Sequence, residues 1–139
     1  MGLIYAEIEI IRSDDLALVN EGYIQPDKVR KMKVQALVDS GAYMLCINEN
    51  IKDQLKLKKL DEIEAEMADC RLQKTEILGP VEIQFETRST SCRVVVLPGT
   101  CEVLLSSIPR EDMDVLIDPR QEKLIVNPET PYLAKKKIK

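Results

Sequence analysis

The sequence predicts an all-β domain, a sandwich or closed barrel of short strands, and three observations support this prediction. Apolar and polar residues alternate over residues 3–11 and 31–38, which is the period of a half-buried strand. Further candidate strands follow at intervals of roughly 8–12 residues, separated by turn-forming residues. The length of 139 residues suits one domain, and 45% hydrophobic with 32% charged residues is the balance of a globular chain, not a disordered one.

The first half of the chain predicts three strands and one helix. The strand over residues 3–11 places four apolar side chains, from Ile4 to Ile10, on one face. Residues 12–30 are polar and contain turn formers such as Gly22 and Pro26, so we expect a long hairpin loop there. Strands at 31–38 and 43–47 follow. Asn48 is a good N-cap and predicts a short helix over about 49–56.

Candidate strands fill most of the second half, at residues 62–69, 71–78, 80–87, 90–97, 101–105, 115–117 and 123–126. Breaks at Asp69-Cys70 and Gly79-Pro80 separate the first three of these strands. Along the first of them Glu62, Glu64 and Glu66 share one face, which we expect to be solvated. A short helix is expected near 108–113. The domain then spans residues 1–127, and residues 128–139, with their terminal lysines, are expected to form a solvated tail.

Composition excludes several classes of function. The chain has no histidine, which removes Ser-His-Asp and Cys-His catalysis and most zinc hydrolases. The net charge of −4 argues against a nucleic-acid partner. The cysteines form no C-x-x-C pair and are expected to be reduced thiols, not metal ligands: Cys46, Cys70, Cys92 and Cys101. We therefore expect no metal and no cofactor.

The N-terminal residues show no secretion signal, and no apolar run approaches the roughly 18 residues that a membrane span needs. We therefore expect a cytoplasmic protein with no membrane partner.

The run Ala36-Leu37-Val38-Asp39-Ser40-Gly41-Ala42 carries the chemistry that the sequence suggests. Apolar residues bring Asp39 to the end of a strand, and a carboxylate there needs hydrogen-bond donors. Ser40 can supply a hydroxyl, and Gly41 can supply a backbone amide that approaches closely because glycine has no Cβ. Alone, Asp-Ser-Gly is also typical of an ordinary turn that ends a strand.

Together with other fragments in the same order, this run resembles the bacterial branch of the retroviral-like aspartic proteases (retropepsin fold). Residues 38–42 match the segment that carries the family's catalytic aspartate, here Asp39, with Ser40, Gly41 and Ala42 supporting it. The flap segment of the family resembles Ala68-Asp69-Cys70, and Leu104-Leu105-Ser106 resembles the segment that packs behind the catalytic loop. Ile117-Asp118-Pro119 resembles the family's closing turn. Cys70 and Ser106 stand where the family has glycine.

The resemblance implies an aspartic endopeptidase with a retropepsin-like closed β-barrel (acid protease fold) that works as a homodimer, because the chain has a single such motif. Two Asp39 carboxyls would share a proton and activate water. A flap that includes Met67, Ala68, Asp69 and Cys70 would cover an extended peptide or protein substrate. Two alternatives stay open: an inactive peptide-binding or assembly module on the same dimeric fold, and an accessory subunit of a larger complex.

Overall fold

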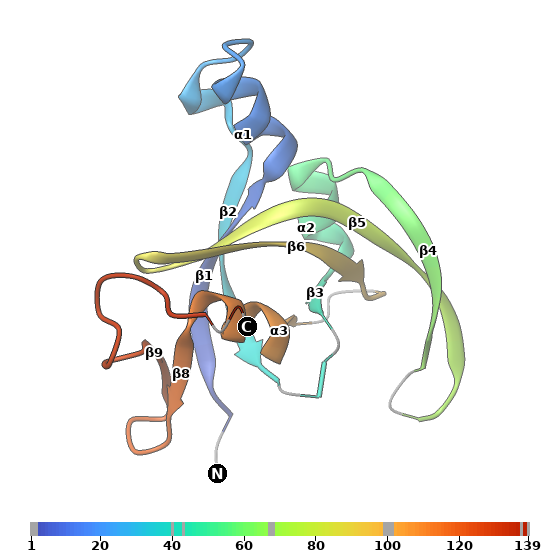
Figure 1. Ribbon diagram of the computed structural model, residues 1–139. Coiled ribbons are helices and arrows are strands. Elements are labelled where there is room, and N and C mark those ends of the chain that lie inside the picture. Colours follow the sequence, from blue (N-terminus) through green and yellow to red (C-terminus); the bar gives the residue numbers. More distant parts are fainter. Residues whose placement is uncertain are drawn as a thin grey trace.

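The computed structural model describes residues 3–39, 41–42, 44–66, 69–98, 102–136 and 138 of the chain (Figure 1). The strands within these residues are β1 (Tyr5–Arg12), β2 (Lys31–Val38), β3 (Leu45–Ile47), β4 (Lys59–Glu66), β5 (Leu72–Phe85), β6 (Arg88–Val96), β7 (Val103–Leu105), β8 (Val115–Asp118) and β9 (Lys123–Val126). The helices are α1 (Ser13–Asn20), α2 (Glu49–Leu55) and α3 (Ser107–Met113), with a 3-10 turn, η1 (Pro26–Lys28).

In the described part of the chain, seven strands form one sheet in the order β1-β2-β7-β3-β6-β5-β4. An additional pairing of β1 with β5 closes six of them into a barrel, and β4 remains outside as an edge strand. Strands β8 and β9 form a separate antiparallel pair. The predicted closed β-barrel is therefore confirmed.

The period-two pattern near the N-terminus corresponds to a half-buried strand, as predicted. Strand β1 pairs antiparallel with β2 from Tyr5↔Leu37 to Ile11↔Lys31. Its alternate side chains Ile8 and Ile10 are fully buried in the barrel core. The C-terminal half of β1 also pairs with β5 along its other edge, from Glu9↔Gln84 to Arg12↔Val81. Burial of this apolar face on folding is what fixes the register of both pairings.

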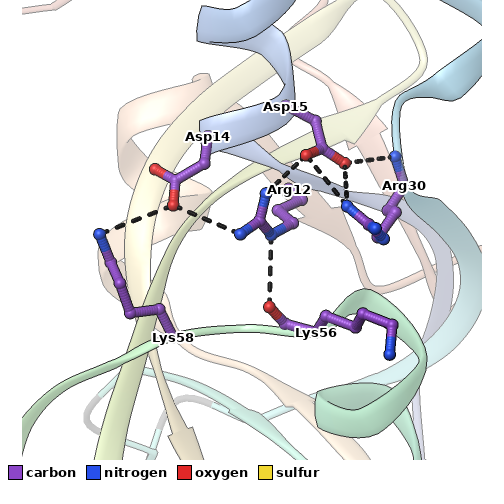
Figure 2. Close-up of polar contacts among 6 residues, drawn as sticks. All are labelled: Arg12, Asp14, Asp15, Arg30, Lys56 and Lys58. Carbon is purple, nitrogen blue, oxygen red and sulfur yellow. Dashed lines mark hydrogen bonds and ion pairs between the residues drawn. The ribbon is translucent and has the colours of Figure 1, made fainter. Parts of the chain in front are cut away.

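The expected loop over residues 12–30 is wrong, because helix α1 and the turn η1 occupy most of it. The buried carboxylate of Asp15 connects the segment over residues 12–30 to the barrel (Figure 2). Oδ1 accepts a hydrogen bond from Nη1 of Arg12 at 2.5 Å, and Oδ2 accepts one from the backbone N–H of Arg30 at 2.8 Å. Nε of Arg12 also donates to the carbonyl of Lys56 at 3.3 Å, so the network reaches the end of α2.

The expected break at Gly79-Pro80 is also wrong, because β5 runs through it as one strand. The irregularity is a register shift against β6 between Leu78 and Val81, and the Gly79–Pro80 bond is cis. Gly79 has a φ of 120°, a conformation open to glycine but not to a residue with a Cβ. The bulge thus accommodates a proline, which lacks a backbone donor, inside a long strand.

Both predicted helices are present and serve the core. Helix α2 follows its predicted N-cap, with Oδ1 of Asn48 accepting from the N–H of Ile51 at 3.0 Å. Its Ile51 and Leu55 side chains are buried. Helix α3 buries Pro109 and Met113 against the barrel. No helix in the described residues is long and apolar enough to span a membrane.

The segment after β9 is tied to the barrel by Asp114. Its carboxylate accepts hydrogen bonds from the Asn127 side chain, the Thr130 hydroxyl and the Lys135 backbone N–H, at 3.0, 2.5 and 2.9 Å. These bonds, led by that from Asn127, together with the charge of Arg88 lower the pKa of Asp114 to about 2. Residues 127–135 are therefore held by an ionised carboxylate at neutral pH.

Candidate active site

The backbone of Asp39 is fixed by the strand pairing below it. Strand β2 runs parallel to β7, with Val38 opposite Leu105, and Asp39 follows directly. Its N–H donates to the carbonyl of Leu105 at 3.0 Å, which extends the pairing by one residue beyond the strand. Leu105 is fully buried, so this partner belongs to the rigid core. The aspartate is delivered by an ordered element, as precise positioning of a reactive group requires.

The carboxylate of Asp39 is oriented by Gly41. The N–H of Gly41 donates to Oδ1 of Asp39 at 2.9 Å, and the N–H of Ala42 donates to the Asp39 carbonyl at 3.3 Å. A Cβ added at Gly41 would lie 3.3 Å from that same Oδ1, closer than ordinary contact, so glycine allows this approach. Ser40 was also predicted to support the carboxylate, and it lies outside the described residues.

A cavity of about 780 Å³ opens beside Asp39, and Gly41 and Ala42 lie at its border. The other charged side chains that line it are Glu64 and Glu66 of β4. The remaining wall is mainly apolar and comes from several elements: Met44, Cys46, Ile63, Val95, Leu97 and Leu104. The cavity thus combines one hydrogen-bonded carboxylate with an apolar wall, which is the general form of a substrate site.

The segment Leu104-Leu105-Ser106, predicted to pack behind a catalytic loop, lies beside the strand end that precedes Asp39. Leu105 holds the Asp39 backbone, and Leu104 reaches the cavity. Ser106 is fully buried and is the N-cap of α3, but its hydroxyl makes no capping bond and has no hydrogen-bond partner among the described residues. The third helical residue, whose N–H a capping serine commonly uses, is Pro109 and has no N–H to give.

We expect Ser106→Ala to raise the free energy of unfolding by about 1 kcal/mol, because burying a hydroxyl without a partner is costly. Thermal and denaturant unfolding of the purified variant measure the change. Ser107→Ala, at the next and partly exposed position, is the control and should change little. A loss of stability in Ser106→Ala comparable to that of a removed hydrogen bond would show that the hydroxyl has a partner in solution.

Two of the predicted flap residues, Met67 and Ala68, lie outside the described residues. Asp69 and Cys70 form the described part of the turn between β4 and β5. The Asp69 carboxylate accepts from the N–H of Arg71 at 3.1 Å and from its Nε at 2.5 Å. Cys70 has a φ of 67°, so it keeps the left-handed conformation that glycine favours. The turn therefore places a cysteine in a backbone conformation that glycine favours.

Three of the four cysteines lie within the described residues. Cys46 is buried, Cys70 is exposed and Cys92 is partly buried, while Cys101 lies outside the described residues. Burial, helped by the charge of Asp112, raises the pKa of Cys92 to about 12, so this thiol stays protonated at neutral pH. No group of potential ligands in the described chain could hold a metal ion.

Arg110 and the two cavity glutamates are site residues that the sequence did not reveal. Nε of Arg110, on α3, donates to the carbonyl of Ser106 at 3.3 Å. Burial lowers the pKa of Arg110, and the charges of Glu111 and Asp39 oppose this, which puts Asp39 within electrostatic reach. Glu64 and Glu66 were expected to be solvated, and they are exposed but also line the cavity. In the sequence, the signal for Arg110 was its place four residues after Ser106, one helical turn from the segment expected near Asp39.

The barrel has a retropepsin-like fold. Among solved structures it is similar to the retroviral protease-like domain of Ddi1 from Leishmania major. The TM-score is 0.55 with 12% identical residues, and the match covers 92% of this chain and 90% of that one. At this identity the likeness concerns the fold alone. Comparison of the sequence with protein-family models and with curated proteins gives no match.

Proposed function

We propose that this chain is an aspartic-type endopeptidase that works as a homodimer, with one Asp39 from each subunit. The observation that carries the proposal is the Asp39 carboxylate, held by the Gly41 N–H at 2.9 Å beside the cavity. The retropepsin-like fold supports it, because the aspartate lies after a barrel strand in the order that the resemblance implies. One subunit supplies one such aspartate, so the reaction needs a second copy.

The proposed chemistry follows from two carboxyls that face each other. Two such groups about 3 Å apart do not both ionise readily and share one proton. The ionised carboxylate takes a proton from water, and the protonated one donates to the peptide carbonyl. The product of this step is a tetrahedral intermediate with no covalent bond to the enzyme. In this scheme Gly41 keeps each carboxylate in position, and the turn after β4 covers the substrate.

Cleavage of a pool of unfolded peptides, followed by mass spectrometry at about pH 4 to 7, tests the proposal. We expect cuts by the wild type and a loss of at least about a thousandfold in Asp39→Asn, because the variant cannot supply the ionised carboxylate. Asp118→Asn is the matched control, since its carboxylate only accepts from Arg120 and Gln121 backbone N–H groups in an exposed turn.

The dependence on protein concentration completes the test. On dilution, cleavage should fall faster than linearly, because dimers dissociate. Cuts that survive in Asp39→Asn would contradict the proposed chemistry, and so would a sample that is dimeric but cuts no peptide. The second result would favour a peptide-binding module on this fold.

A further inference from the structure

Among the described residues, the charged residues on the cavity beside Asp39 all have the same sign. Three acidic residues line it, Asp39, Glu64 and Glu66, and no described lysine or arginine does. The rest of the wall is mainly apolar. A ligand that fits this cavity therefore combines apolar groups with positive charge.

The carboxylates of the two glutamates are unpaired within the described part of the chain. Neither the Glu64 nor the Glu66 carboxylate makes an ion pair or hydrogen bond with another described residue, although Lys74 lies opposite Glu64 in the strand register. Their neighbour Glu62 differs, because its Oε2 accepts from Nζ of Lys59 at 2.7 Å. Two carboxylates at the cavity are thus available to a ligand, while the third on the same strand face is already paired.

Four consecutive residues of β4, from Ile63 to Glu66, show how the cavity lies against this strand. Side chains alternate along a strand, so Ile63 and Ala65 point to one face and Glu64 and Glu66 to the other. All four nevertheless line the cavity, so the cavity runs along the edge of the strand. In the described part of the chain β4 pairs only with β5, and it is the last strand of the sheet. Figure 1 shows β4 and the first part of β5 as a hairpin at the right of the view. The free edge of β4 can pair with an extended peptide.

We infer that this cavity selects extended peptides in which apolar and basic side chains alternate. A peptide strand paired with the free edge of β4 places successive side chains on opposite faces. Those on the face of Ile63 and Ala65 meet the apolar wall, and those on the other face meet Glu64 and Glu66. This inference rests on the proposed function, because it names the substrate class of the Asp39 site.

The alternation distinguishes this inference from general attraction between opposite charges. The chain carries a net charge of −4, so any basic peptide is attracted weakly. General attraction depends on composition alone, whereas pairing along β4 depends on the order of residues. Peptides of equal composition and different order therefore separate the two explanations.

The test measures binding of short fluorescent peptides to Asp39→Asn by anisotropy, in low and high salt. The peptides alternate leucine with lysine, alternate leucine with serine, or carry the same leucines and lysines in two blocks. We expect the alternating lysine peptide to bind about tenfold more tightly than the other two. Glu64→Gln combined with Glu66→Gln should remove that preference. Glu62→Gln, which removes one negative charge from the same strand face two residues before Glu64, should keep it.

Each outcome decides the inference. Equal binding of the alternating and block peptides, an equal loss in Glu62→Gln, or no binding by any peptide would overturn it. Cleavage by the wild type is measured with the same peptides. Cleavage without a preference for the alternating lysine peptide would overturn this inference and leave the proposed function standing. Preferential binding without cleavage would overturn the proposed function and retain the selectivity.

Discussion

Asp15→Ala is expected to lower the free energy of unfolding by about 3 kcal/mol, because it leaves two arginines without the carboxylate that pairs them. The Asp15 side chain is 1% exposed and Arg12 is 19% exposed, so water screens their contact only weakly (Figure 2). Arg30 is 43% exposed and is better solvated when its partner is removed. We therefore expect a value near the lower end for a broken buried pair.

Asp14→Ala is the matched control for this prediction. Asp14 precedes Asp15 on α1, but it is 37% exposed and its ion pairs with Arg12 and Lys58 are longer, at 3.6 and 3.7 Å. We expect a change below about 0.5 kcal/mol, as for most exposed ion pairs. Urea unfolding of both variants measures the difference. Similar small losses in the two variants would show that the Asp15 network contributes little to folding.

The same network gives the protein a dependence on acid. Burial on its own would raise the pKa of Asp15, but the backbone N–H of Arg30 and the charges of Arg12 and Arg30 lower it overall. A carboxyl with a lowered folded-state pKa stabilises the fold above its unfolded value of about 4, and this contribution is lost as the pH falls through the folded-state pKa. The difference between wild type and Asp15→Ala should therefore shrink below about pH 4.

The segment over residues 12–30, which the Asp15 network holds against the barrel, could not be predicted correctly from the sequence. The strands β1 and β2 were predictable because period-two burial leaves a mark on every second residue. Helix α1 leaves no comparable mark, since its N-terminal flanking residue is Arg12 and makes no capping bond. Its most deeply buried residue is Asp15, a charged residue whose burial depends on Arg30, fifteen positions later in the chain. Such a long-range pairing is not visible in a local pattern.

The chemistry of the site was predictable only in part. The run around Asp39 indicated a carboxylate held by the Gly41 amide, and the structure shows that bond. The positions of Glu64 and Glu66 were not predictable, because they depend on which edge of β4 stays unpaired. Sheet order is decided by tertiary packing, which alternation along one strand does not encode.

Cys70 and Ser106, the two residues expected to stand in place of glycine, differ in backbone conformation. Cys70 has a φ of 67°, so the backbone still demands the conformation that glycine adopts readily. Ser106 has a φ of −82° and a ψ of 174°, an extended conformation that any residue adopts. At Ser106 the energetic cost therefore comes from the buried hydroxyl and not from the backbone conformation. This difference places strain at the turn between β4 and β5 and leaves the backbone behind Asp39 relaxed.

Mixing wild-type subunits with an excess of Asp39→Asn subunits, at constant total protein concentration, is expected to suppress cleavage far more than the smaller share of wild-type subunits alone would. In the proposed dimer each active site takes one Asp39 from each subunit, so a mixed pair lacks the second carboxyl. With a ninefold excess of the variant, random pairing leaves about 1% of dimers fully wild type, against about 10% activity if each subunit acted alone. The extra tenfold loss follows from symmetry and is independent of the chemistry's rate.

The measurement needs proof that subunits exchange. Native mass spectrometry of differently labelled subunits shows the mixed dimers, and cleavage is recorded in the same samples. An excess of Glu62→Gln, which keeps Asp39 and lies outside the cavity lining, is the control and should not suppress cleavage. Activity that stays proportional to the wild-type subunits while mixed dimers are abundant would mean that one Asp39 suffices. The two-fold site would then be wrong, and a water activated within one subunit would have to explain the reaction.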